Sequence, residues 1–158
     1  MFRDLQRKNQ QLSSQECAEI LENEKRGVLS VIGDNGYPYA MPMNHWYNSE
    51  DKCIYFHCGK NGHRNDSLRK CNKASFCVYD KGIRDEGEWA YKFRSVIVFG
   101  KIDFIDDAET VIDISRKLSY KFTSDEDYIN KEIAQAAERT VLLKLTVEHM
   151  CGKRVTEA

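Results

Sequence analysis

The 158-residue sequence contains no apolar run that approaches the ~20 residues a membrane-spanning helix needs. Its first segment, Met1 to Gln11, is polar and charged and lacks the apolar core of a signal peptide. The net charge is −1, so composition gives no electrostatic reason to expect nucleic acid or an anionic membrane as a partner. These absences predict a cytoplasmic protein.

The cysteines form no CxxC pair, which argues against a structural zinc site. In the cytoplasm all six should be reduced thiols: Cys17, Cys53, Cys58, Cys71, Cys77 and Cys151. No repeat, low-complexity stretch or linker interrupts the chain. With 41% apolar and 31% charged residues, the sequence predicts a single globular domain over residues 1–158.

Six segments have the composition or alternation of β-strands. Asp34-Asn35-Gly36 tolerates positive φ and predicts a hairpin between the first two. Pro42 interrupts the second strand and predicts a bend or an edge position, because proline donates no ladder hydrogen bond. The predicted strands are 28–32, 37–47, 53–58, 73–79, 94–105 and 141–147.

Helices are expected at the start of the chain, after the third strand and before the last. Ser13 and Glu16 have capping-box spacing ahead of a first helix. Strands that arrive as hairpins, without regular βαβ alternation, favour an antiparallel barrel with peripheral helices over a doubly wound parallel sheet. The predicted helices are 14–24, 65–71, a segment from about 107 to 120, and 124–138.

The segment Tyr55 to Leu68 combines a strand, a loop with two glycines and the start of a helix. Glycines let backbone N–H groups approach a ligand, and a helix N-terminus offers unpaired donors with partial positive charge. His63 and Arg64 occupy the first turn, where cations disfavour the helix unless an anion binds. The local pattern is equally compatible with an ordinary strand–turn–helix whose charges are solvated.

The chain resembles the FMN-binding split-barrel superfamily related to pyridoxamine 5′-phosphate oxidase, and within it the nitroimidazole-resistance-type flavoproteins. The similarity runs from about residue 12 to 153, and the 55–68 segment is its most specific part. The other blocks are Gly27–Val31 with Gly36–Tyr39, Pro42–Asn44, Arg94–Lys101 and the closing Cys151–Arg154.

This resemblance implies a mainly β (α+β) fold, a six-stranded antiparallel split β-barrel of Greek-key type with peripheral helices. It also implies a homodimer with FMN at the subunit interface. In that arrangement Leu29 and Ser30 would lie along the flavin, Met43 and Asn44 near the isoalloxazine ring, His57 and Cys58 along the ribityl and ring region, His63 and Arg64 at the phosphate, and Ser95 and Met150 around the same interface.

Two departures disfavour vitamin B6 oxidation. Pyridoxamine phosphate oxidases usually carry an arginine–lysine pair where this chain has His63-Arg64, and a basic, phosphate-binding C-terminus where this chain ends at Ala158. We therefore expect an FMN-dependent oxidoreductase that delivers electrons or hydride to a nitro compound, quinone or similar small molecule. No catalytic residue and no metal site is predicted, since His57, Cys58 and His63 do not form a recognised ligand set.

Alternatives are a flavin- or haem-binding barrel without turnover, and a structural dimer that has lost its cofactor.

Overall fold

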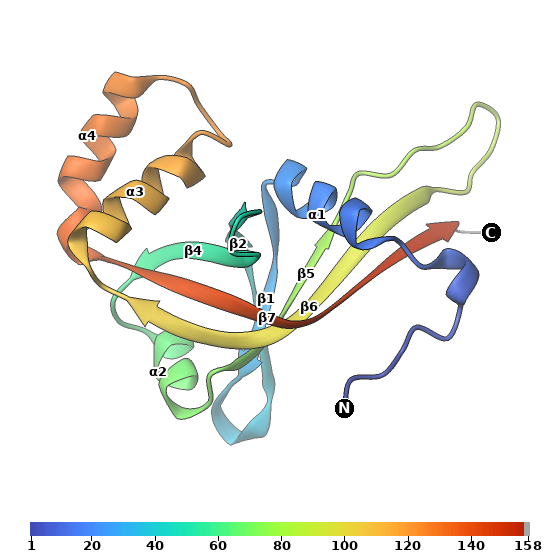
Figure 1. Ribbon diagram of the computed structural model, residues 1–158, viewed down its shortest axis with the longest axis horizontal. Helices are drawn as coiled ribbons and strands as arrows, with labels where there is room; N and C mark the ends of the chain where they lie inside the picture. Colours follow the sequence, from blue (N-terminus) through green and yellow to red (C-terminus); the bar gives the residue numbers. More distant parts are fainter. Residues whose placement is uncertain (157–158) are drawn as a thin grey trace.

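A single antiparallel sheet dominates the computed structural model, which describes residues 1–156. Its strands are β1 (Arg26–Ile32), β2 (Pro38–Asn44), β3 (Trp46–Asn48), β4 (Cys53–Gly59), β5 (Lys73–Tyr79), β6 (Lys92–Ile105) and β7 (Thr140–Thr156). They lie in the order β2-β1-β5-β6-β7-β4-β3, and the sheet curls into a half-barrel (Figure 1). The predicted mainly β, antiparallel fold is confirmed, but the sheet has seven strands rather than six.

The extra strand arises at His45, which divides the predicted second strand into β2 and β3. There the chain leaves its pairing with β1 and joins β4, so consecutive strands form the two opposite edges of the sheet. Pro42 is predicted to cause a bend or to lie at a sheet edge. The structure shows the edge position, because Pro42 lies within the edge strand β2. The turn before β2 has the expected positive φ at Asn35 and Gly36.

The last strand is much longer than its alternation predicts. β7 pairs with β6 from Leu142 to Thr156, with a register shift at Phe99/Gly100 that leaves Glu148 unpaired. This bulge ends the alternation that predicted a strand only as far as Val147. A Cβ on Gly100 would collide with the carbonyl oxygen of Thr146, so the ladder needs glycine at that position.

Four α-helices surround the sheet: α1 (Ser14–Asn23), α2 (His63–Lys70), α3 (Ala108–Ser119) and α4 (Glu126–Ala136). Single 3-10 turns occupy Lys8–Gln10, Asp34–Gly36 and Ala137–Arg139. The capping box of α1 is present, with the Glu16 N–H donating to Ser13 Oγ and the Ser13 N–H donating to the Glu16 carboxylate. Within residues 1–156, no helix is long and apolar enough to cross a membrane.

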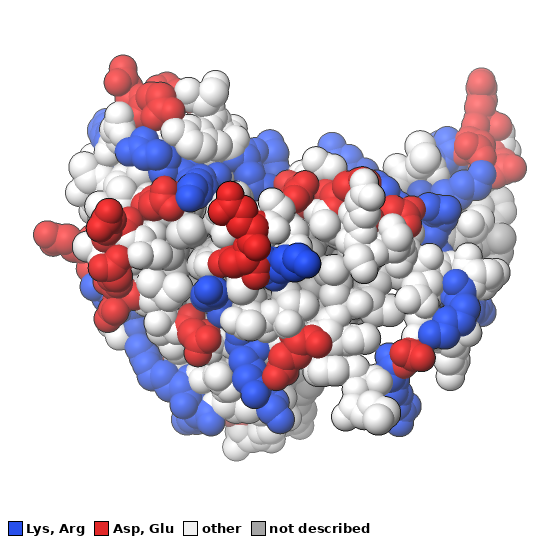
Figure 2. Space-filling view, in the orientation of Figure 1, with Lys and Arg blue, Asp and Glu red and all other residues white. Residues whose placement is uncertain are grey.

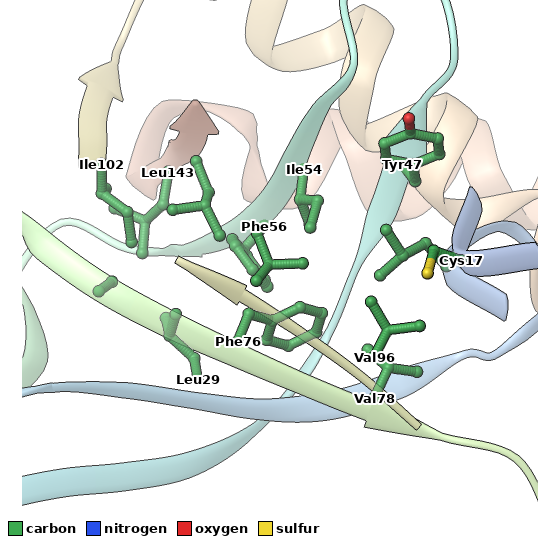
Figure 3. Close-up of a cluster of buried hydrophobic side chains, with 14 of the residues drawn as sticks. Cys17, Leu29, Tyr47, Ile54, Phe56, Phe76, Val78, Val96, Ile102 and Leu143 are labelled. Atoms are coloured by element: carbon green, nitrogen blue, oxygen red, sulfur yellow. The ribbon is translucent and has the colours of Figure 1, made fainter. Parts of the chain in front are cut away.

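The hydrophobic core lies between the curled strands and α1 (Figure 3). Phe56 and Phe76 meet edge to face at its centre, with ring centroids 4.9 Å apart, and both are fully buried. Helix α1 contributes Cys17, Ile20 and Leu21. A second buried cluster, which includes Tyr55, Ile114 and Leu142, packs α3 on β4 and β7, and α4 in turn packs on α3 (Figure 1). The core therefore fixes β4, the strand that leads into the glycine loop.

Candidate functional site

Helix α2 begins with backbone donors that no side chain caps. Its N-cap is Gly62, at φ +119°, and this residue makes no side-chain capping hydrogen bond. A Cβ built on Gly59 or Gly62 would meet nothing within 4 Å, so space is open beside the loop. Unpaired N–H groups beside open space are what a phosphate needs at a helix N-terminus.

The side chain of Arg64 lies at this helix start with its charge unneutralised. Its Nε donates to Asn65 Oδ1 at 3.1 Å, and its Nη1 lies 3.3 Å from Met43 Sδ. The nearby carboxylates are engaged elsewhere, Asp66 by Arg69 and Asp34 by Lys70. A half-buried guanidinium without an anionic partner among residues 1–156 is suited to bind an anion.

The ring of His63 is held at the edge of the same region. It stacks on Tyr39 with ring centroids 4.3 Å apart, and its Nε2 lies 3.4 Å from Asp34 Oδ2. The hydrogen bond from Lys70 holds the pKa of Asp34 below its usual range, so this carboxylate stays ionised. A hollow of about 280 Å³ separates β2 from the loop and is lined by Tyr39, Met41, Pro42, Met43, Asn61, Gly62, His63 and Arg64.

Asn65 connects the parts of this site. It is fully buried, its Nδ2 donates to the Gly59 carbonyl at 2.7 Å, and its Oδ1 accepts from Arg64 Nε. The Cys58 thiol lies 3.9 Å from the same Oδ1. Sequence reasoning missed both Asn65 and Tyr39 as site residues. Only Tyr39 left a signal, since it alternates with Met41 and Met43 along one face of β2.

His57 and Cys58 end β4 close to the glycine loop. Although His57 is exposed as a residue, the protein around its ring removes water from it. This desolvation lowers the pKa of His57 and favours the neutral imidazole. Burial raises the pKa of the Cys58 thiol, with Arg64 opposing the shift, so the protonated thiol is favoured. Cys58 is therefore a poor nucleophile, and His57 offers one donor and one acceptor.

The remaining predicted residues do not line the hollow beside α2. The side chain of Leu29 is fully buried in the core, so only its backbone is able to contact a cofactor, and Met150 also packs against the core. Asn44 accepts a hydrogen bond from Arg26 at 2.8 Å. Ser30 and Ser95 lie on the outward face of the sheet, opposite Ser75 and Tyr79 of β5.

One chain thus gathers Met43, Cys58, His63 and Arg64 around the start of α2, with His57 beside them, and leaves Ser30 and Ser95 on another surface.

A family model described as pyridoxamine 5′-phosphate oxidase matches residues 13–154. The chain belongs to this family. The match spans nearly the whole sheet and all four α-helices, including the β4–α2 segment. A search of curated proteins returns no match.

Several solved structures share the fold of this family member. A candidate 5-nitroimidazole antibiotic resistance protein from Bacteroides thetaiotaomicron has a TM-score of 0.78 at 21% identity, over 93% of this chain and 87% of its own. A FAD-binding protein from Mesorhizobium loti scores 0.64 at 20% identity, over 92% and 96%. A flavocytochrome from Azotobacter vinelandii scores 0.77 at 19% identity, over 96% and 72%. The fold is therefore one that flavoproteins use.

Proposed function

We propose that this protein is an FMN-dependent oxidoreductase whose flavin lies at a homodimer interface. The observation that carries the proposal is the uncapped start of α2 beside the unneutralised Arg64 guanidinium. A phosphomonoester fits both features, because its oxygens accept from backbone N–H groups and from the arginine fork. The flavoproteins of the same fold support a flavin as the group that carries this phosphate.

The residues around α2 would then bind and orient the cofactor. Arg64 and the backbone at Gly62 hold the phosphate, while Met43 contributes an apolar surface on the side of β2. His57 and Cys58 line the path from the phosphate toward the ring. When bound, the flavin supplies hydride or electron transfer to a small acceptor such as a nitro compound or quinone, and the protein supplies position and electrostatics.

The homodimer is supported by an apolar patch on the outward face of the sheet. Four of its side chains are substantially exposed: Ile32 at 49%, Tyr79 at 60%, Ile97 at 42% and Phe99 at 37%. Several exposed apolar side chains on one face of a sheet are typical of an interaction surface. Ser30 and Ser95 lie in the same face, so a second copy docked there would bring them toward a shared site.

The proposal is tested by the change Arg64→Ala. The charge-assisted hydrogen bonds lost in this variant contribute about 2 kcal/mol of binding free energy. FMN binding should therefore weaken about 30-fold. Riboflavin has no phosphate, so its affinity should stay unchanged in the variant. The exposed Arg139→Ala is the matched control and should bind FMN like the parent protein. Flavin fluorescence titration measures all three.

Equal affinity of parent and Arg64→Ala for FMN would contradict the phosphate assignment. Failure of the parent protein to bind FMN at all would contradict the function.

A second candidate is a haem-binding barrel without turnover, favoured by the flavocytochrome of the same fold. Of the four histidines, His57 is exposed and stacks on no aromatic side chain among residues 1–156, whereas His45 is buried and the rings of His63 and His149 are stacked on aromatic side chains. A Soret band after reconstitution with haemin, abolished by His57→Ala and retained in Arg64→Ala, would favour this function over the first.

A further inference from the structure

A second hollow, of about 290 Å³, lies between the end of β4 and the α3–α4 pair. His57 and Cys58 line it from β4, Ile112 and Ser115 from α3, and Ile133 and Ala136 from α4. We call it the α3–α4 pocket. Through Cys58 and Asn65 it adjoins the residues at the start of α2, on the other side of the β4 terminus.

Helix α4 covers this pocket instead of packing on the sheet. Its first half is clamped to α3, with Arg116 donating to Glu126 at 3.1 Å and to Asn130 at 2.7 Å. Tyr120 also donates to Glu126, and Ile129 is buried at the same end. In the second half of the helix, Ile133 and Ala136 line the pocket, so the helix presents an apolar face to the hollow.

The chemistry of the lining favours an uncharged occupant. The Ser119 and Thr140 hydroxyls already donate to the Ser115 and Ala136 carbonyls at 2.8 Å. Among residues 1–156, Glu132 is the one acidic side chain of the lining and is exposed, and no lysine or arginine lines the pocket. An anionic ligand would lose hydration here without gaining a counter-charge, and a cationic one would find only the solvent-exposed Glu132 carboxylate.

The neutral His57 imidazole is able to donate a hydrogen bond to a ligand in the pocket or to accept one from it.

We propose that the α3–α4 pocket binds an uncharged molecule of one or two fused rings with a carbonyl oxygen, such as a quinone. A reduced flavin bound nearby would give up two electrons and two protons and become oxidised, and the quinone would leave as the hydroquinone. The inference rests on the proposed function for the electron exchange, but the binding itself depends only on the pocket. The volume lies at the small end of ligand sites, which fits a small ring system.

The test uses Ala136→Trp, which fills the pocket, and Ala134→Trp as its matched control on the exposed side of α4. The probe is menadione, an uncharged two-ring quinone, titrated calorimetrically into the full-length, FMN-loaded protein. We expect Ala136→Trp to weaken menadione binding at least about tenfold, as blocked apolar contacts do. The control should match the parent protein, and both variants should retain FMN.

Three outcomes would overturn the inference. Unchanged menadione affinity in Ala136→Trp would place the probe elsewhere. Joint loss of menadione and FMN would make the pocket part of the flavin site itself. Loss of dimerisation in Ala136→Trp alone, measured by sedimentation, would make a second copy of the chain the occupant.

Two further measurements keep the test decisive. If Ala136→Trp does not fold, Ile133→Ala replaces it. Menadione binding should then weaken about tenfold, because apolar contact is lost. The exposed Lys131→Ala is the control and should bind menadione like the parent protein. If the protein binds no FMN, menadione is titrated into the flavin-free chain. Binding that still depends on Ala136 would then support the pocket while the proposed function fails.

Discussion

At the residue scale, His45 shows how one buried polar group joins distant parts of the chain. Its ring is fully buried between β2 and β3, and Nε2 lies 2.8 Å from the Leu21 carbonyl at the end of α1. Lys121 donates to the same carbonyl and to that of Glu24. Burial, reinforced by the Lys121 charge, lowers the pKa of His45 to about 3. The neutral ring is therefore the form that the fold accepts.

This burial predicts acid sensitivity. In the unfolded chain His45 titrates near its ordinary pKa of 6.5, while in the folded chain it resists protonation down to about 3. Below pH 6.5 the unfolded state binds the extra proton, so stability falls with decreasing pH by up to about 1.4 kcal/mol per pH unit. Urea denaturation of the parent protein between pH 7 and pH 5 should show this slope.

The variant His45→Gln should lose most of that slope, even though the substitution lowers stability at pH 7. The half-exposed His149→Gln is the control and should keep it. Identical slopes in the parent and in His45→Gln would show that another group controls the acid response.

At the element scale, the bulge between β6 and β7 sets where the sheet bends and how far β7 continues. The ladder resumes at Phe99↔His149 only because Glu148 is skipped, and Gly100 lies directly at the shift. Beyond it, Gly152 packs so closely on Leu12 and Cys17 that a side chain would not fit. Close approach at Gly100 joins β6 to β7, and close approach at Gly152 joins β7 to α1 and to the segment that precedes it.

The change Gly100→Ala should destabilise the protein by about 2 kcal/mol or more, because its Cβ would overlap the Thr146 carbonyl. Gly59→Ala is the matched control, since a Cβ there meets nothing within 4 Å, and its stability should stay within about 0.5 kcal/mol of the parent. Denaturant midpoints measure both. Equal midpoints for the two variants would mean that the bulge relaxes at little cost.

At the scale of the whole molecule, charges of both signs are spread over the surface, while one face of the sheet exposes apolar side chains. Basic and acidic side chains intermix over the face shown in Figure 2, as the net charge of −1 suggests. The outward face of the sheet instead exposes Ile97 and Phe99, and the chain between β5 and β6 carries Trp89 with 73% of its surface exposed. Phe2 already stacks on His149 beside this face.

From this distribution we expect Ile97→Lys to convert the proposed homodimer into a monomer, because a charge would be buried in an apolar interface. The control is Tyr128→Lys, whose parent side chain is 55% exposed on α4, away from the sheet. Light scattering after gel filtration should give twice the 18.4 kDa chain mass for the parent and control, and the chain mass for Ile97→Lys. FMN affinity should fall with the dimer; a monomer that keeps full affinity would place the flavin within one chain.

Local chemistry in the sequence determined several features of this protein. The Ser13–Glu16 capping box, the alternation of β7 up to Val147 and the strand–glycine–helix order at residues 55–68 all depend on residues close together in the chain. Such signals predicted the antiparallel sheet, its helices and the α2 start as the place for an anion.

The tertiary structure alone decided where the sheet edges fall and which surfaces the site residues face. The break at His45, the continuation of β7 past Glu148 and the burial of Leu29 depend on pairing and packing partners far away in sequence. The same is true of Asn65 and of the pocket under α4, because a hydrogen-bond network or a hollow exists only between elements that folding brings together.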